Sequence, residues 1–428
     1  MTASREDFLE AAWRIGAELC REAIWDGARC NWLGDMMEFQ FGAWSVVHRS
    51  SGPDLYSGTS GTGLFLLRLD RFAPDKRIRA TAAGALEQAV SRADTIPPSL
   101  RHGFYTGSLG IAYALLEGAE VLDRPDWRVK AWALIDEMCS TDPDPGGLDV
   151  LAGIAGAVPF LLRLYKCEHR ENLLDSAVRL GESLLLRANK SDKGWSWTTM
   201  PPMVAAAPDL TGFSHGTGGI GWTMLELHHA TGRDDFRQAG VEAIRYEQFW
   251  FQADIENWPD FRGEPTPSHN GTMRHICATA WCHGAPGIGL ARLRAFLLLA
   301  DPDYRSQAEA AIRTTVRAIN ASPAQDNYSL CHGLGGNAEL LIFADAVLPS
   351  NGYYEIAATV GRRGIELYDR ASMPWPSGIT GGGFNPSLML GTAGVGHFFL
   401  RLHDPASVDS VLILTPERIG QPQSDRTA

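Results

Sequence analysis

Residues 282–287 read Cys-His-Gly-Ala-Pro-Gly and residues 331–336 read Cys-His-Gly-Leu-Gly-Gly, and each stretch opens a long apolar run. A Gly-x-x-Gly step that is followed by an apolar run, as in these two stretches, recurs seven times along the chain. Its first glycine stands at positions 58, 107, 153, 216, 284, 333 and 391, so neighbouring copies lie between 46 (107 to 153) and 68 (216 to 284) residues apart. Recurrence of one step at such a period indicates a fold assembled from repeated supersecondary units.

Two kinds of helix alternate between these steps. Each step is followed by a segment that is apolar nearly all round, which predicts a buried helix; these segments are 64–69, 111–116, 158–164, 220–227, 288–299, 338–346 and 395–402. Amphipathic segments lie between them; these are 79–93, 128–138, 172–188, 235–250, 304–319 and 354–369. Each repeat is therefore predicted to be a helical hairpin, entered through a turn in which glycine supplies close backbone approach and a positive φ.

A closed ring of hairpins buries such helices better than an open solenoid does, because helices that are apolar all round need neighbours on most sides. We therefore predict an all-α fold, a double-layered α/α toroid (barrel) of seven helical-hairpin repeats. The repeats run from about residue 55 to residue 402 within a single domain of residues 1–428. We expect N-terminal helices in residues 1–54 and a polar tail over residues 416–428.

The charge and cysteine content argue against some kinds of binding partner and favour a reducing location. The 428 residues include 50 Asp and Glu against 38 Lys and Arg, a net charge of −12, and the arginines are scattered. Such a surface argues against nucleic acid or an anionic membrane as the partner. The sequence shows no apolar stretch long enough for a membrane span and no signal-peptide pattern. Seven cysteines, an odd number, then favour free or metal-bound thiols in a reducing, cytoplasmic location.

The residues just before the first glycine distinguish three neighbouring repeats from the others. These repeats carry Ser214-His215, Cys282-His283 and Cys331-His332 at the same register. In a ring of equivalent units, such side chains converge at one end. Two thiolates and an imidazole are the ligands that Zn²⁺ prefers, and three protein ligands leave the open position typical of a catalytic zinc. Core packing and a Cys282–Cys331 disulfide are the alternatives, and spacing alone leaves His283 and His332 both open as the third ligand.

A histidine without a cysteine marks the fourth repeat. His215 lies in the same layer as the two Cys-His pairs, and an imidazole can gain and lose a proton near neutral pH. Asp149 stands four residues before Gly153 in the preceding repeat and could orient His215. The alternatives are a hydrogen-bonded core histidine and an aspartate that serves as a helix N-cap.

The two Cys-His-Gly runs, together with residues 214–219 (Ser-His-Gly-Thr-Gly-Gly), resemble the lanthionine synthetase C-like cyclases from about Leu55 to Leu402. The resemblance implies an α/α toroid with one zinc ion. It also implies a role for each residue of the site: Cys282, Cys331 and His332 as zinc ligands, His215 and Asp149 as the acid–base pair, and His283 beside the metal or facing the substrate. One position departs from the pattern, because Ala278 stands where some relatives have an arginine.

The function implied is thioether ring formation. Zinc would hold a peptide cysteine as thiolate, which adds to dehydroalanine or dehydrobutyrine to give lanthionine or methyllanthionine. The partners would be a dehydrated precursor peptide and a separate dehydratase or lyase–kinase. Two alternatives stay open: addition of glutathione or another free thiol, and a zinc-binding scaffold without catalysis. A glycosidase would need two convergent carboxylates, which the repeat entries do not offer, and a prenyltransferase would need a basic diphosphate pocket.

Overall fold

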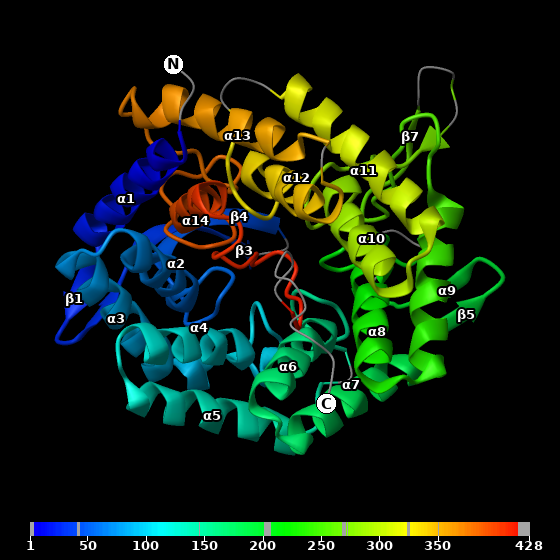
Figure 1. Cartoon of the computed structure of the whole chain (residues 1–428), viewed down its shortest axis with the longest axis horizontal. Helices are drawn as coiled ribbons and strands as arrows, with labels where there is room; N and C mark the ends of the chain where they lie inside the picture. Colours follow the sequence, from blue (N-terminus) through cyan, green and yellow to red (C-terminus); the bar gives the residue numbers. More distant parts are fainter. Residues whose placement is uncertain are drawn as a thin grey trace.

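The computed structural model describes residues 4–40, 43–144, 146–200, 207–267, 271, 273–322, 326–349 and 351–417. In this part of the chain, seven helices form an inner ring, and each begins directly after the first glycine of a Gly-x-x-Gly step (Figure 1). They are α2 (Thr59–Phe72), α4 (Ser108–Val121), α6 (Ile154–Glu168), α8 (Thr217–Thr231), α10 (Ala285–Leu299), α12 (Leu334–Val347) and α14 (Thr392–His403). The predicted buried helices and the α/α toroid are thus confirmed.

A second layer of helices surrounds this ring. Six outer helices each follow an inner one in sequence, as the hairpin prediction requires; they are α3 (Lys76–Ser91), α5 (Pro125–Ser140), α7 (Glu171–Leu186), α9 (Asp234–Trp250), α11 (Pro302–Ala321) and α13 (Tyr353–Gly364, continued by the π-turn η3, Ile365–Asp369). The outer partner of α14 is instead α1 (Arg5–Glu22), from the other end of the chain. Phe8 of α1 stacks on Phe399 of α14 with ring centroids 6.2 Å apart. The N-terminal helix therefore completes the seventh hairpin.

The second glycine of each step is required by close packing. A Cβ there would overlap the carbonyl oxygen of the residue six positions earlier at each of Gly61, Gly110, Gly156, Gly219, Gly287, Gly336 and Gly394. The predicted positive φ of the first glycine is wrong except at Gly284, where φ is 92°. The other first glycines are extended N-caps, such as Gly333 with φ −112° and ψ −177°. Close backbone approach, rather than left-handed backbone, is the general reason for the motif.

Backbone hydrogen bonds join the turns into a ring at one end of the barrel. In each pair of bonded turns, the residue two before the first glycine donates its N–H to the carbonyl of the equivalent residue in the neighbouring turn. The bonds are Tyr56 to Tyr105 (2.9 Å), Leu151 to Ser214 (3.1 Å), Ser214 to Cys282 (3.2 Å), Cys282 to Cys331 (3.3 Å), Cys331 to Met389 (3.0 Å) and Met389 to Tyr56 (3.0 Å). Between the second and third repeats, the Thr106 hydroxyl donates to the Leu151 carbonyl at 3.3 Å instead. The predicted convergence of this register is confirmed.

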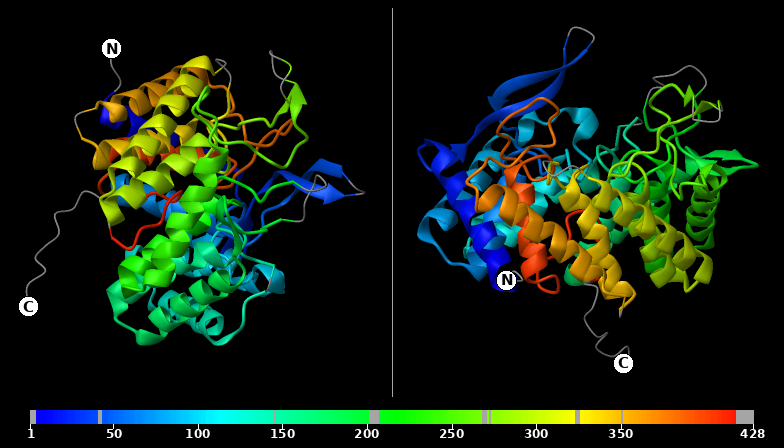
Figure 2. Two further views of the ribbon diagram at one scale, coloured as in Figure 1. Left: turned by 90° about the vertical axis from the view of Figure 1, so that its right-hand side faces the viewer. Right: turned by 90° about the horizontal axis from the view of Figure 1, so that it is seen from above.

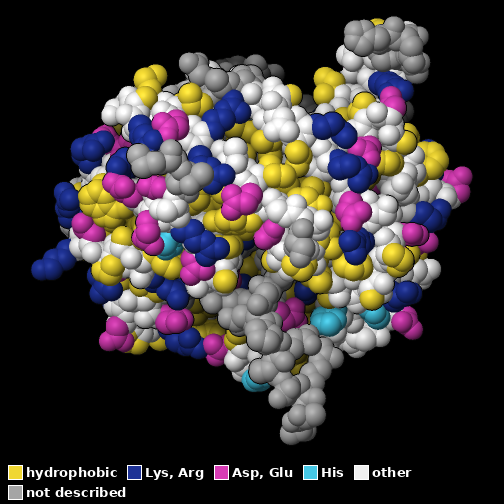
Figure 3. Space-filling view, turned by 45° about the horizontal axis from the view of Figure 1, so that its top comes forward, with side chains coloured by type: hydrophobic (Ala, Val, Ile, Leu, Met, Phe, Trp, Pro, Cys, Tyr) yellow, Lys and Arg dark blue, Asp and Glu magenta, His cyan; other side chains and the backbone are white. Residues whose placement is uncertain are grey.

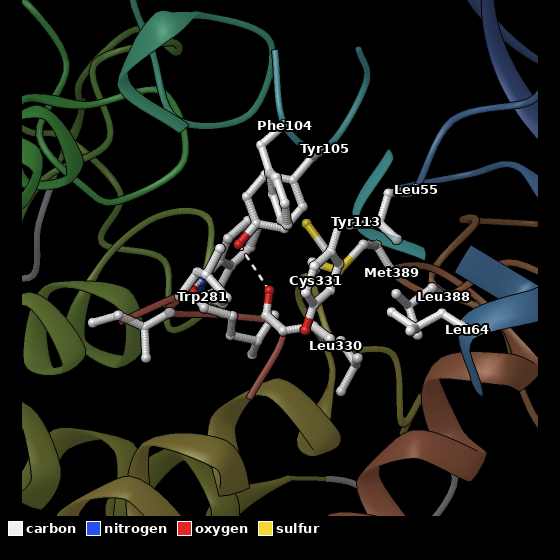
Figure 4. Packing of buried hydrophobic residues seen from close by; sticks show 14 of the residues in the cluster. Leu55, Leu64, Phe104, Tyr105, Tyr113, Trp281, Leu330, Cys331, Leu388 and Met389 are labelled. Carbon is white, nitrogen blue, oxygen red and sulfur yellow. Dashed lines mark hydrogen bonds between the residues drawn. The ribbon is translucent and has the colours of Figure 1, made fainter. Parts of the chain in front are cut away.

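The chain after α14 fills the middle of the barrel. Val411 to Leu414 are buried there, and Tyr105 Oη donates to the Val411 carbonyl while Trp281 Nε1 donates to the Leu412 carbonyl, both at 2.8 Å. Figure 4 shows Tyr105 and Trp281 in this packing, with Cys331 close by. Glu417, in the expected polar tail, bonds to Arg294 of α10 at 2.9 Å. Residues 418–428 of that tail lie outside the described residues.

Ion pairs tie neighbouring helices together inside the protein. Arg294 of α10 pairs with Glu226 of α8 at 2.6 Å, and Arg401 of α14 pairs with Glu339 of α12 at 2.8 Å. All four side chains are at most 6% exposed. Removing one partner of such a pair leaves an uncompensated buried charge, so these pairs fix which helices are neighbours.

The described residues form four antiparallel hairpins beside the ring, and the first two correct the expectation of N-terminal helices over residues 1–54. After α1 the chain forms β1 (Ile24–Asp26) with β2 (Arg29–Asn31), then β3 (Leu33–Gln40) with β4 (Ala43–Ser50). Met37 pairs with Val46 in the second hairpin, which projects from the ring (Figure 2). Two shorter hairpins are β5 (Asn189–Ser191) with β6 (Gly194–Ser196) and β7 (Thr266–Pro267) with β8 (Met273–Arg274).

The outer surface carries both signs of charge. On the face in Figure 3, Lys and Arg side chains are interspersed with Asp and Glu. Among the described residues, none of the helices combines the length and the apolar character needed to cross a membrane.

Candidate functional site

Three side chains from two neighbouring turns form a cluster suited to a metal ion. Cys282 precedes α10, whereas Cys331 and His332 precede α12, and one ligand atom from each lies within 4.8 Å of the others. The hydrogen bond between the two cysteine backbones holds the turns side by side. Two thiols and one imidazole are a donor set that zinc prefers, so these residues fit the predicted metal.

The His332 ring is oriented from its far side. Its Nε2–H donates to the carbonyl oxygen of Gly378 at 2.7 Å, which leaves Nδ1 as the atom that faces the cysteines. A Cβ at Gly378 would lie 2.8 Å from His332 Nε2 and 2.9 Å from Ser329 Oγ. Only glycine therefore lets this backbone approach the imidazole so closely. A fixed partner on the second nitrogen is how proteins set the tautomer and direction of a metal-binding histidine.

Hydrogen bonds already favour a thiolate at the cluster. The bond from Cys331 lowers the pKa of the Cys282 thiol well below its ordinary value, and the same bond raises the pKa of Cys331. Burial raises the pKa of Tyr56, so its hydroxyl stays protonated and donates to the Cys331 sulfur. A metal would displace the shared protons, because metal-binding thiols and imidazoles must give up theirs. The hydrogen-bonded thiols also exclude the alternative of a Cys282–Cys331 disulfide in this structure.

The predicted pairing of His215 with Asp149 is present. His215 Nδ1–H donates to Asp149 Oδ2 at 2.5 Å, which leaves Nε2 available to a substrate. The other carboxylate oxygen accepts the N–H of Ala152 at 2.6 Å, so Asp149 is itself fixed. Asp149 thus orients the histidine and also ties its own turn. This geometry is that of a histidine held by a carboxylate for proton transfer.

His283 follows the ligand candidate Cys282 in sequence, and its ring lies near that of His215. Its ring centroid is 5.9 Å from that of His215, it is 2% exposed, and neither ring nitrogen has a hydrogen-bond partner among the described residues. Burial lowers the pKa of His283 to about 4, so the ring is neutral at physiological pH. The ligand cluster contains His332 and not His283. An orphaned buried imidazole of this kind is unusual and suits a group that bonds to a substrate.

A loop that the repeat pattern did not single out borders the same site. Residues 257–262 are bound to the turn before α10, because the Asn257 side chain accepts the N–H of Ala285 at 3.0 Å and donates to the carbonyl of Ala278 at 3.0 Å. Ala278, the position that departs from the family pattern, thus contributes a backbone contact. The loop carries Arg262, and its charge reaches both Cys282 and Cys331.

Sequence reasoning missed three groups in this site. Tyr56 has the same register as Cys282 and Cys331, so aligning the turns could have found it. Arg262 and Gly378 lie in long irregular segments, which carry no repeat register and therefore no sequence signal of this kind.

A family model described as "Lanthionine synthetase C-like protein" matches residues 49–413. The chain is 23% identical over 309 residues to "Nisin biosynthesis protein NisC" of Lactococcus lactis subsp. lactis, covering 67% of this chain and 72% of that protein. It is 22% identical over 309 residues to "Lacticin 481/lactococcin biosynthesis protein LcnDR2" of the same organism, covering 69% of this chain and 30% of that protein. The solved structure of "Nisin cyclase" superposes with a TM-score of 0.68 at 17% identity, over 94% of this chain and 95% of that one.

Proposed function

The chain belongs to the lanthionine synthetase C-like family, and on that premise we propose that it is a zinc-dependent cyclase. It would add cysteine thiols of a peptide to dehydroalanine or dehydrobutyrine in the same peptide, forming lanthionine or methyllanthionine rings. The observation that carries the proposal is the cluster of Cys282, Cys331 and His332 at the same end of the toroid as the His215–Asp149 pair.

Cys282, Cys331 and His332 would hold the zinc ion through two sulfurs and Nδ1. When bound, zinc would act as a Lewis acid that favours the deprotonated form of a substrate thiol. Gly378 fixes the direction of the His332 ring, and Tyr56 donates a hydrogen bond to the Cys331 sulfur. With zinc bound, Cys282 and Cys331 would both be thiolates, and the hydrogen bond from Tyr56 would stabilise the negative charge on Cys331. These two supports act on the ligands rather than on the substrate.

His215 would supply the proton that completes the addition. When the thiolate attacks the β-carbon, the electron pair of the double bond moves to Cα and its carbonyl, and Cα then needs a proton. The bond to Asp149 fixes Nδ1 of His215, so Nε2 is the atom that would carry this proton. Asp149 would stabilise the charged imidazolium before the transfer. His283, neutral and without a partner among the described residues, would bond to the peptide beside it.

The substrate would be a precursor peptide in which an earlier enzyme has dehydrated serine or threonine. That step would come from a dehydratase or a lyase–kinase acting before this protein. A single catalytic domain over residues 1–428 and a cytoplasmic location both stay predictions from the sequence.

The test is to incubate the protein with a dehydrated, cysteine-containing peptide, with and without a chelator, and to count free thiols by mass spectrometry after alkylation. Loss of peptide thiols without change in peptide mass, abolished by the chelator, is expected. Retention of all thiols in the presence of zinc would refute the proposal. If glutathione in the mixture adds instead and raises the peptide mass, the protein is a free-thiol transferase of the same family.

A further inference from the structure

The proposed addition creates a negative charge that the groups described so far do not neutralise. When the carbon–sulfur bond forms, the electron pair of the Cα=Cβ bond is displaced onto the carbonyl oxygen of the same residue, giving an enolate. His215 supplies a proton to Cα, but the enolate oxygen needs a donor of its own while the charge develops. Fixed hydrogen-bond donors at such an oxygen are usually a large part of catalysis.

Arg262 is a cation with an unused donor beside the site. Asp260 accepts from its Nε at 3.0 Å and from its Nη2 at 2.5 Å, so one edge of the guanidinium is held by the carboxylate. Within the described residues, no partner lies at hydrogen-bond distance from Nη1. A guanidinium is always charged and presents its donors in a rigid fork, so fixing one edge also fixes the direction of the remaining N–H groups.

The loop that carries Arg262 is anchored to the catalytic turns on both sides. Asp260 N–H donates to the carbonyl of Ile276 at 2.8 Å, and Thr211 Oγ1 donates to the carbonyl of Pro259 at 2.6 Å. Thr211 leads into the turn of His215, and Ile276 leads into the turn of Cys282. The loop therefore bridges the element that carries the proton donor and the element that carries a metal ligand.

The charge of the guanidinium acts on the groups of the site to which its loop is anchored. Its charge acts on Cys282 and Cys331 and on both His283 and His332. The ring of His283 lies 5.9 Å from that of His215 between centroids. A peptide held with its thiol at the cysteine cluster and its Cα near His215 would bring the carbonyl bonded to that Cα into the space that this charge reaches.

Resting on the proposed function, we infer that Arg262 is a catalytic residue whose Nη1 donates a hydrogen bond to the enolate oxygen, and that Asp260 is the positioning residue that aims it. The thiolate forms the carbon–sulfur bond, the π pair moves to the oxygen facing Arg262, and the pair returns to Cα as His215 delivers the proton. Arg262 stays protonated throughout, so it gains and loses nothing in the cycle.

The experiment compares Arg262→Gln and Arg262→Lys with the parent protein and with Arg274→Gln as a matched control. Arg274 is a half-exposed arginine of the adjoining hairpin that pairs with Asp254. We measure the single-turnover rate of ring formation, zinc content, and binding of the dehydrated peptide by fluorescence anisotropy. Arg262→Gln should lose about 10²–10³-fold in rate, the range for removing one such donor. Zinc content and peptide binding should stay near those of the parent, and Arg274→Gln should cyclise normally.

Chemical rescue and isotope exchange separate this role from a structural one. Millimolar guanidinium should restore part of the rate of an Arg262→Ala variant, but not of a His215→Ala variant. The ring-containing product, incubated with the parent protein in D₂O, should exchange its α-proton through the same enolate, and Arg262→Gln should slow this exchange together with the forward rate. Circular dichroism identifies any variant that fails to fold, and Arg262→Lys then replaces it, with an intermediate rate expected.

The outcomes that overturn the inference are distinct from failure of the proposed function. If the parent protein forms no rings, the proposed function fails. If the parent cyclises and Arg262→Gln keeps a rate within threefold, or if guanidinium gives no rescue, Arg262 does not stabilise the enolate. A variant that loses zinc in proportion to its rate would assign Arg262 to the charge balance of the cysteine cluster instead.

Discussion

Replacing Gly378 by alanine is the change for which the structure gives the sharpest prediction. The new Cβ would stand 2.8 Å from His332 Nε2 and 2.9 Å from Ser329 Oγ. Because ordinary contact needs about 3.5 Å, the imidazole must retreat by roughly 0.7 Å or rotate. Either movement weakens the 2.7 Å hydrogen bond to the Gly378 carbonyl and turns Nδ1 away from the two sulfurs.

The expected loss of zinc affinity can be estimated. Removing the partner that orients a metal-binding side chain typically costs 10–100-fold in metal affinity. This corresponds to about 1.4–2.7 kcal/mol. Gly378 does not have a positive φ, so the substitution adds no backbone strain, and the fold should keep its melting temperature. The expected result is therefore a selective loss of zinc affinity.

The assay is competition for zinc against a chromophoric chelator, together with the absorption spectrum of the cobalt-substituted protein. Gly263→Ala is the matched control, because a Cβ there would meet nothing within 4 Å. Zinc affinity should fall in Gly378→Ala and stay unchanged in Gly263→Ala. Parent-like affinity and an unchanged cobalt spectrum in Gly378→Ala would refute the idea that this backbone orients the ligand.

Four further results are expected. The cobalt spectrum should change in His332→Ala and stay nearly unchanged in His283→Ala; the opposite pattern would transfer the ligand role. His215→Ala should keep zinc but form rings about 10²–10⁴-fold more slowly, with mixed diastereomers on chiral analysis, whereas a single diastereomer at normal rate would leave this histidine without a catalytic role. Glu339→Ala should lower the free energy of unfolding by about 3–5 kcal/mol in denaturant titrations, since it strands the buried arginine of α14; a loss below 1 kcal/mol would contradict this. Burial holds the pKa of His397 well below its usual value, so below about pH 6.5 this histidine binds a proton in the unfolded chain but not in the folded protein. The free energy of unfolding should therefore fall by up to about 1.4 kcal/mol for each pH unit below that value, and His397→Gln should reduce this slope.

The repeat pattern in the sequence predicts most of the fold. Helix positions, the order of inner and outer layers and the convergence of one register all follow from seven glycine steps and the apolar runs behind them. This worked because a Gly-x-x-Gly step is needed wherever a helix packs against a carbonyl six residues back, as at Gly336 and Leu330. The repeat pattern does not predict the N-terminal strands, because residues 24–50 lie outside the repeats.

By itself the sequence also indicated the core of the candidate site, since Cys282 and Cys331 hold one position of equivalent turns and His215 holds the next, and equivalent turns of a ring lie at the same end. The tertiary structure alone decided what the register cannot encode. It brought α1 to α14, seated residues 411–414 in the barrel and set Gly378 against His332. It also anchored the loop of Arg262 to the segments that lead into the turns of His215 and Cys282. Local periodicity specifies the contacts that each unit makes with its neighbours, whereas irregular segments are placed by the surface that the finished ring presents to them.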